Sequence, residues 1–170
     1  MDEFVAAMGA AVTGVSVVTT DGPSGRAGLT VSAMASVSAD PPMLLVCINR
    51  QSPIVSRIRV HGAFAVSVLG THHAAIADSF AGRPGAGDDA YDFASARWHS
   101  GDTGAPVLAD AAAAFDCLVA TTVEAGSHTL FIGDVVQAQR GTALPLAYTR
   151  RAYSAPLPLL SQPTPTRRSR

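Results

Sequence analysis

Gly28 to Asn49 reads GLTVSAMASVSADPPMLLVCIN, and this stretch carries the strongest signals for the fold. Its first part is rich in small, hydroxyl and β-branched side chains, which predicts a β-strand over about 27–38. The sequence Asp40-Pro41-Pro42 ends that strand, because proline has no N–H to donate to a β-ladder. The apolar run 43–48 has the length of one strand and predicts a strand buried on both faces.

Similar short segments, separated by turn residues, continue on both sides of this stretch. We expect further strands at 12–20, 62–69, 111–123, 130–139 and 146–148. We expect short helices at 2–11, 53–59 and 72–80. A glycine-rich loop at 82–104 is long enough to indicate a functional segment. Short strands with few helices predict a mainly β fold, an antiparallel β-barrel with small helices at its ends.

Length and composition indicate one folded domain. The chain has 170 residues, of which 48% are hydrophobic and 15% charged, and this excludes a disordered chain. We expect one domain over 1–154 and a disordered tail, rich in Pro and Arg, over 155–170. The net charge of −1 argues against a nucleic-acid partner. No apolar run reaches the ~20 residues of a membrane span, so we expect no membrane partner.

The ends and the rarer residue types narrow the protein class further. The acidic start Met1-Asp2-Glu3 lacks the basic residues of a signal peptide. Two isolated cysteines, Cys47 and Cys117, form neither a zinc motif nor a disulfide framework. We therefore expect a cytoplasmic protein with inert, buried thiols. All 12 basic residues are Arg, which excludes a Lys Schiff base and a P-loop Lys.

Hydroxyl side chains recur along the predicted strand 27–38. Thr30, Ser32, Ser36 and Ser38 have even spacing and share one face of a regular strand, although a bulge would redistribute them. Such a row is a poor core but a good surface for a flat polar ligand, because the backbone is easily approached. The alternative is the solvated face of an edge strand.

A polar loop and a helix start follow the apolar run. Ser52 is a typical N-cap residue and Pro53 a typical first helical residue. A helix N-terminus suits a phosphate, and Arg57, one turn into the helix, would add positive charge. The alternative is an ordinary capped helix with a surface arginine.

The histidines give weaker signals. His128 follows the predicted turn Gly126-Ser127 and would lie near a rim, as a proton donor, ligand contact or metal ligand. His72 and His73 are adjacent, and neighbours on an α-helix point about 100° apart, so they do not easily share one ion. We therefore expect no metal site. Neither a nucleophile elbow nor a Rossmann glycine motif is present in the sequence.

Taken together, these features resemble the short-chain flavin reductases, the reductase components of two-component flavin monooxygenases. The resemblance runs from about Phe4 to Tyr153. The segments that carry it are AMGAAV (7–12), VVTTDGPSGRAG (17–28), SVSADPP (36–42), LLVCIN (44–49), FAVSVL (64–69), FDC (115–117) and GSHTL (126–130). It is strongest to the branch serving pyrimidine utilisation, with the 4-hydroxyphenylacetate branch next.

The resemblance implies a flavin-binding split β-barrel of Greek-key antiparallel topology that forms a homodimer. It implies that NADH or NADPH reduces FMN or FAD, and that the reduced flavin passes to a separate monooxygenase. The implied flavin contacts are Thr30, Val31, Ser32, Ala33, Ser36 and Val37 along the ring and ribityl chain, Cys47, Ile48, Asn49 and Ser52 toward the phosphate, and Phe80 and Gly82 as a cover. The implied nicotinamide contacts are His128, Arg150 and Tyr153, with His128 as the candidate catalytic residue.

Two other functions fit the same residues. One is a flavoprotein reductase with tightly bound FMN that acts on a bound substrate such as a corrinoid. The other is a non-catalytic flavin-binding module. Ser127 stands where the family usually has Asp, so details of nicotinamide binding that depend on that Asp do not transfer.

Overall fold

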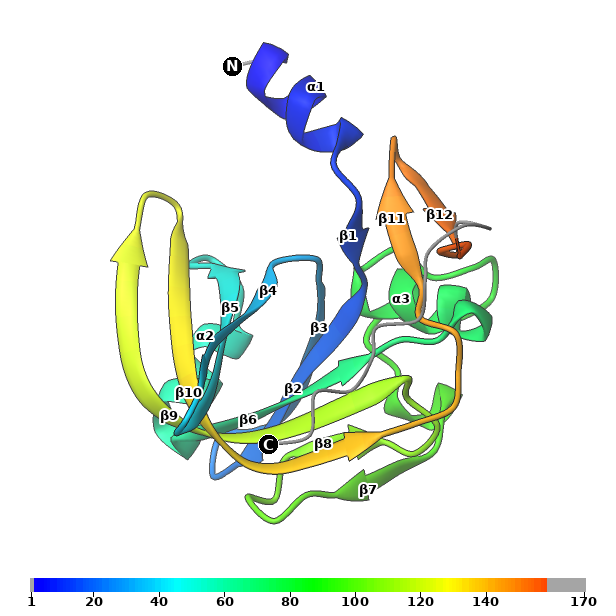
Figure 1. Cartoon of the computed structure of the whole chain (residues 1–170). Helices are drawn as coiled ribbons and strands as arrows, with labels where there is room; N and C mark the ends of the chain where they lie inside the picture. Colours follow the sequence, from blue (N-terminus) through cyan, green and yellow to red (C-terminus); the bar gives the residue numbers. More distant parts are fainter. Residues whose placement is uncertain (1, 159–170) are drawn as a thin grey trace, which may run out of the picture.

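A seven-stranded antiparallel sheet forms the body of the computed structural model, which describes residues 2–158. Its strand order is β3-β2-β6-β9-β10-β5-β4 (Figure 1). The strands are β2 (Ser16–Gly22), β3 (Gly25–Val31), β4 (Met34–Ala39), β5 (Pro42–Asn49), β6 (Ala63–Val68), β9 (Ala113–Ala125) and β10 (His128–Arg140). The predicted mainly β, antiparallel architecture is therefore confirmed. The long pair expected at 111–123 and 130–139 is the β9–β10 hairpin.

Smaller elements surround this sheet. A three-stranded sheet contains β1 (Thr13–Gly14), β11 (Ala147–Thr149) and β12 (Ala152–Ser154), and a two-stranded sheet contains β7 (Trp98–Ser100) and β8 (Pro106–Leu108). The helices are α1 (Asp2–Ala10), α2 (Ile54–His61) and α3 (Ala74–Phe80), with 3-10 turns η1 (Thr71–His73) and η2 (Phe93–Ser95). Thus the predicted loop 82–104 contains η2 and β7. No helix within residues 2–158 is long and apolar enough to cross a membrane.

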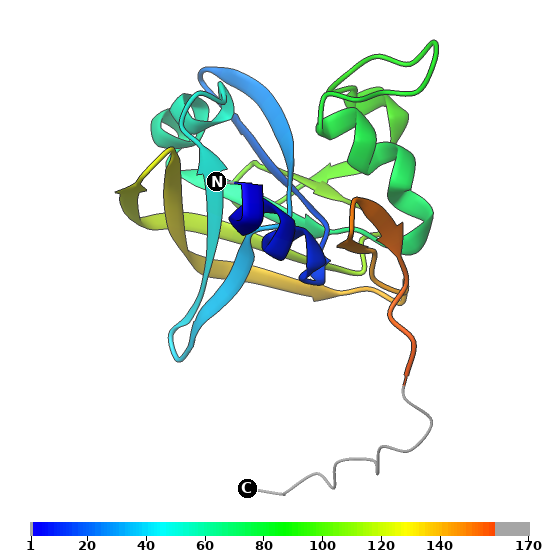
Figure 2. The same cartoon turned by 90° about the horizontal axis from the view of Figure 1, so that it is seen from above.

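The strand predicted over 27–38 is two strands at opposite edges of the sheet. β3 ends at Val31, β4 begins at Met34, and the two residues between them join the edges. The sheet curls around its core, so β3 comes into contact with β5, and the Cys47 N–H donates to the Ala33 carbonyl at 3.0 Å (Figure 2). A register shift between Ser36 and Ser38 further breaks the alternation. The four hydroxyls therefore do not form one row, and the single-strand prediction is wrong.

Burial along β5 also differs from the expectation. Leu44, Val46 and Ile48 are buried, whereas the alternate residues Met43, Leu45 and Cys47 are half-buried. One face of β5 lies inside the curled sheet, and the chain itself leaves the other face partly uncovered. The strands buried on both faces are instead β2 and β6, which separate two apolar clusters.

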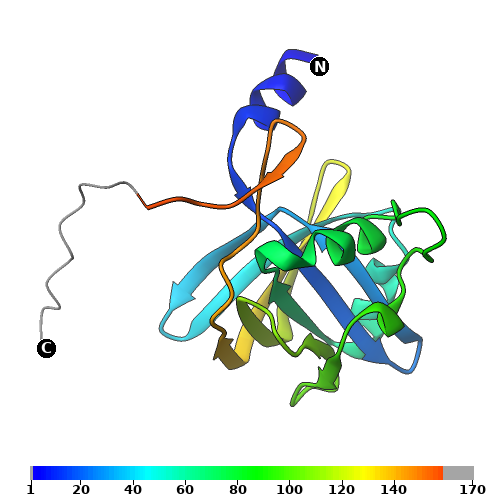
Figure 3. The same cartoon turned by 90° about the vertical axis from the view of Figure 1, so that its right-hand side faces the viewer.

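The helices follow from local sequence with small shifts. α2 begins at Ile54. The Pro53 backbone before it already has helical angles (φ −58°, ψ −23°), and no side-chain capping bond is present there. Ser52 contributes its carbonyl, which accepts from the Val55 N–H at 3.1 Å, so its predicted side-chain capping role is wrong. α1 projects away from the sheet beside β11 and β12 (Figures 1 and 3). Of the predicted disordered tail 155–170, residues 159–170 lie outside the described part.

Candidate functional site

The free edge of β3 and the start of α2 border the larger of two cavities that lie along this strand. This cavity, the α2 pocket, has a volume of about 320 Å³ and is lined by Arg26 to Leu29, Ser52 to Ile54, Arg57, Tyr91 and Phe93. It brings together Ser52 and Arg57, as the sequence predicts. Both residues belong to one local segment, which explains why sequence reasoning could pair them.

Two guanidinium groups give the α2 pocket its charge. The half-buried Arg57 donates from Nη1 to the Arg26 carbonyl on the open edge of β3. The Arg26 guanidinium lies 5.3 Å from the centre of the Phe93 ring, and its Nε donates to Asp21 at 2.8 Å. Together with the Ser52 hydroxyl, this donor set suits an oxyanion such as a phosphate monoester.

Among the polar and aromatic residues that line this pocket, sequence reasoning missed Arg26, Tyr91 and Phe93. Arg26 lies at the start of β3, and the two aromatic residues belong to the long loop after α3. The only signal was the length of that loop, which indicated a functional segment but not which of its residues.

A second cavity of about 230 Å³ lies at the far end of the same strand. This cavity, the Tyr153 pocket, is lined by Val15, Thr30, Val31, Ser32, Ala81, Arg83, Tyr148 and Tyr153. It unites Thr30, Val31 and Ser32 with Tyr153, which the resemblance assigned to the flavin and the nicotinamide. The Thr30 hydroxyl donates to the Ala77 carbonyl of α3 at 2.8 Å, so that this strand end is fixed to the helix.

Asp78 of α3 holds the two polar side chains of the Tyr153 pocket. The Tyr153 hydroxyl donates to Asp78 Oδ1 at 2.8 Å, and Arg83 Nη2 lies 3.5 Å from the same oxygen. Burial, reinforced by the hydrogen bond and charge of Asp78, raises the pKa of Tyr153 to about 12. The phenol is protonated at neutral pH at its ordinary pKa of 10 already, and the raised pKa extends that state into alkaline pH.

His128 lies next to another predicted contact. It stands opposite Asn49 in the β5–β10 ladder, and its Nδ1 lies 2.9 Å from the Ser127 hydroxyl. The Arg50 N–H donates to the Ser127 carbonyl at 3.0 Å. Both His128 and Asn49 are exposed. The residue that replaces the usual Asp of the family therefore contacts the histidine ring directly.

The remaining predicted contacts are dispersed. Ile48 is buried in the core, and Cys47 is half-buried with its thiol pKa raised by burial. Ala33, Ser36 and Val37 are exposed, the first in the link to β4 and the others on that strand. Arg150 lies between β11 and β12, where its N–H donates to the Gly9 carbonyl of α1 at 2.6 Å.

Phe80 and Gly82 do not form a cover over either pocket. Phe80 is fully buried. Its ring lies directly under β3, where a Cβ added to Gly28 would be 2.5 Å from the Phe80 Cε1 atom. Gly82 has φ +71°, and a Cβ there would lie 2.8 Å from the Tyr91 hydroxyl. Phe80 therefore supports the site strand from the core, and Gly82 permits the turn into the loop that carries Tyr91.

Comparison with known proteins places this geometry in a family. The model for the flavin reductase like domain matches residues 8–156. The chain belongs to the flavin reductase family. This confirms the resemblance that the motifs indicate.

The relatives of this flavin reductase share most of its length. The FMN reductase (NADH) RutF of Bradyrhizobium diazoefficiens is 47% identical over 152 residues, which is 89% of this chain and 81% of the relative. The flavin reductase (NADH) of Kitasatospora aureofaciens is 44% identical over 158 residues, 90% of this chain and 80% of the relative. The structure of the flavin reductase PheA2 matches with a TM-score of 0.84 and 31% identity, over 92% of this chain and 98% of that one. The RutF relatives belong to the pyrimidine-utilisation branch.

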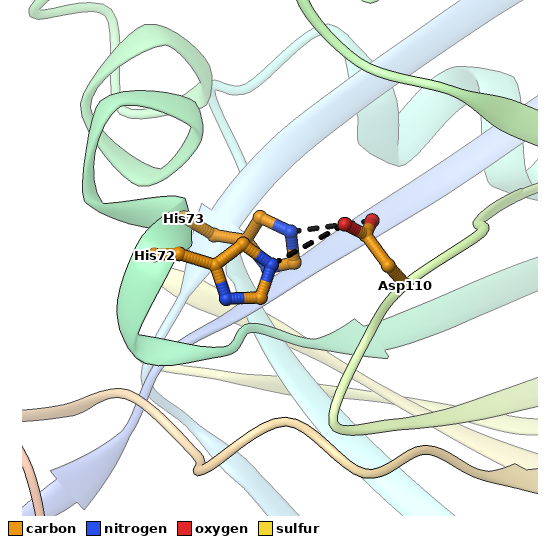
Figure 4. Close-up of side chains that lie close together, drawn as sticks. All are labelled: His72, His73 and Asp110. Atoms are coloured by element: carbon orange, nitrogen blue, oxygen red, sulfur yellow. Dashed lines mark hydrogen bonds and ion pairs between the residues drawn. The ribbon is translucent and has the colours of Figure 1, made fainter.

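The flavin reductase also contains a histidine cluster that the sequence did not indicate (Figure 4). His72 and His73 have ring centres 3.8 Å apart, and the Nε2 atom of each lies 3.3 Å from a carboxylate oxygen of Asp110. The expectation that the two side chains diverge is wrong, because both rings turn toward the carboxylate of Asp110.

The hydrogen bonds of this cluster fix the tautomer of His73. Its Nδ1 accepts the Gly70 N–H at 3.0 Å, so the neutral ring carries its proton on Nε2, which faces Asp110. A metal would need the lone pair of that Nε2. The geometry therefore favours a hydrogen-bonded cluster over a metal site at His73.

This cluster predicts a pH-dependent stability. Burial, together with the charge of His72, lowers the pKa of His73 from its ordinary 6.5, although Asp110 opposes the shift. The folded state thus favours neutral His73, and its contribution is complete above pH 6.5 and lost as the pH falls through the lowered pKa. When the pH is lowered from about 7.5 to about 5.5, the free energy of unfolding should therefore decrease less in His73→Asn than in wild type. Urea unfolding measures this, with His99→Asn as a control; equal pH dependence in His73→Asn and wild type would contradict it.

Proposed function

We propose that this flavin reductase uses NADH to reduce FMN and that the reduced flavin leaves to serve a separate monooxygenase. The relatives named FMN reductase (NADH) support the two substrates. Two similar structures are reductase components of two-component enzymes, a bacterial tryptophan halogenase and a styrene monooxygenase. A further similar structure, an NADH:FAD oxidoreductase, contains NAD and FAD fragments.

The observation that carries this proposal is the donor set of the α2 pocket. The hydroxyl of Ser52 and the guanidinium groups of Arg57 and Arg26 would hold the phosphate of FMN. Thr30 to Ala33, with Ser36 and Val37, would face the ring and ribityl chain, and Cys47 to Asn49 would border them. The flavin, when bound, supplies the hydride-accepting ring, and the protein supplies position and electrostatics.

The nicotinamide side of the site is proposed at His128, Arg150 and Tyr153. Hydride transfer between nicotinamide and flavin needs no side-chain acid or base. We therefore assign His128 the orientation of the nicotinamide, assisted by the Ser127 hydroxyl. Tyr153 remains protonated and offers a neutral ring and hydroxyl in the Tyr153 pocket.

Turnover with free flavin tests the proposal and separates its alternatives. Protein dialysed free of flavin should oxidise NADH only after FMN is added, with saturable dependence on FMN. A yellow protein that retains its flavin and shows little turnover with free FMN would instead support a reductase of a bound substrate such as a corrinoid. Flavin binding without oxidation of NADH or NADPH, with FMN or FAD, would leave a non-catalytic flavin-binding module.

The proposed working form is a cytoplasmic homodimer with a split-barrel, Greek-key fold. Phe4 and Val12 around α1 are each 70% exposed, and an isolated helix of nine residues is unstable in water. The outer face of β5 and β10 offers half-buried apolar pairs, Leu45 beside Ile132 and Cys47 beside Leu130. A second copy of the chain would cover both surfaces. The free thiols fit a reducing compartment.

Changing α1 tests this assembly. Phe4 and Met8 lie on one side of the helix, and burying two such side chains contributes about 3 kcal/mol or more. Sedimentation velocity should give a dimer for wild type, and the Phe4→Ser, Met8→Ser double variant should dissociate at least about tenfold more readily. Val60→Ser, which changes an exposed apolar residue of α2, is the control. A monomeric wild type would contradict the assembly.

A further inference from the structure

The carboxylate of Asp78 joins two segments that the proposed reaction needs together. Its Oδ1 accepts the hydroxyl proton of Tyr153 from β12 at 2.8 Å and lies 3.5 Å from Nη2 of Arg83, which follows α3. Asp78 also accepts the Arg83 N–H at its own carbonyl, at 2.8 Å. Tyr153 and Arg83 both line the Tyr153 pocket, whereas Asp78 does not. No other carboxylate in the described residues contacts either side chain.

We propose that Asp78 is a positioning residue, which fixes the Tyr153 ring and the Arg83 guanidinium for recognition of the nicotinamide dinucleotide. This inference rests on the proposed function. The chemistry of the two held groups fits such a ligand. Tyr153 offers a flat ring and a hydroxyl, and the Arg83 side chain, 62% exposed, keeps donors free for a diphosphate. Asp78 acts through these two residues and does not itself touch the substrate.

Asp78 can be changed without removing the packing of α3. The buried residues of this helix are Ala77, Ser79 and Phe80, and Thr30 is held by the Ala77 carbonyl and not by the Asp78 side chain. The Asp78 side chain is 40% exposed. Asp78→Asn keeps an acceptor for Tyr153 but removes the charge that faces Arg83. Asp78→Ala removes both interactions, so the pair of variants separates the two roles.

Steady-state kinetics of the full chain with FMN and NADH tests the proposal. Asp78→Ala should raise the KM for NADH about tenfold, as expected from loss of one charge-assisted hydrogen bond, and Asp78→Asn should raise it less. The KM for FMN should change less than about twofold in both variants, because none of Asp78, Arg83 and Tyr153 lines the α2 pocket proposed for the FMN phosphate. Asp88→Asn, an exposed change in the following loop, is the matched control.

A spectroscopic readout keeps the test independent of turnover. The phenol titration assigned by difference from Tyr153→Phe should move to lower pH in Asp78→Ala, because the carboxylate that favours the protonated phenol is gone. An unchanged phenol titration, an unchanged KM for NADH, or equal rises of both KM values would overturn the positioning role. If wild type itself fails to oxidise NADH with FMN, the proposed function fails instead, and the phenol titration still reports whether Asp78 holds Tyr153.

Discussion

Arg57→Ala raises the KM for FMN by about 10- to 100-fold, the effect expected when a buried anion loses a charged hydrogen-bond donor. Arg57 is half-buried at the α2 pocket, and its guanidinium also caps the Arg26 carbonyl on the open edge of β3. The KM for NADH should change much less, since the Tyr153 pocket lies at the other end of the strand. Initial rates over a matrix of FMN and NADH concentrations separate the two constants.

Two further variants control for general effects of charge and stability. Arg59→Ala removes a guanidinium from the same helix, but Arg59 pairs with Glu124 and does not line the α2 pocket. It should leave the KM for FMN within about twofold. Arg57→Lys should give an intermediate value, because lysine keeps the charge but loses the fork geometry. An Arg57→Ala protein that folds and binds FMN like wild type would contradict the proposal that Arg57 binds the FMN phosphate.

Gly28→Ala should destabilise the fold by about 1–3 kcal/mol or more, because it overpacks the contact between β3 and the core. The added Cβ would lie 2.5 Å and 2.7 Å from two ring atoms of Phe80, which is fully buried and edge-to-face with Phe93 and Trp98. The ring is packed against both of these aromatic side chains, so moving it away from Gly28 would disturb them. Urea unfolding followed by circular dichroism measures the loss.

A matched glycine and a compensating change identify the cause of that loss. Gly14→Ala adds the same methyl group to a strand where nothing lies within 4 Å, so it should cost far less. Phe80→Leu should recover part of the loss when combined with Gly28→Ala, although it is destabilising alone. Additive effects of Gly28→Ala and Phe80→Leu, or equal costs at the two glycines, would show that Phe80 does not support β3.

Most strands of the large sheet, their turns and the three α-helices could be predicted because they follow from local signals, whereas the short strands β7, β8 and β12 were missed. β-Branched runs, Asp40-Pro41-Pro42 and the turn at 124–127 each mark an element without reference to the rest of the chain. The separation of β3 from β4 could not be predicted in this way. Alternation continues across Ser32 and Ala33, while the chain there passes from one edge of the curled sheet to the other. That passage depends on which strands pair at long range.

The same distinction applies to the site. Ser52 and Arg57 could be paired because one short segment contains both. Tyr153 could be placed near the flavin strand only through the family resemblance, because it lies more than a hundred residues farther along the chain. Asp110 is brought to His73 by tertiary packing. The contacts of Asp78 likewise become visible only in the folded chain.

A crystal structure of this flavin reductase grown with FMN tests the central assignment most directly. The account predicts the phosphate within hydrogen-bond distance of Ser52 and Arg57 in the α2 pocket, and the isoalloxazine ring against Thr30 to Ala33. A phosphate bound elsewhere, or a ring that does not touch the segment between β3 and β4, would contradict it.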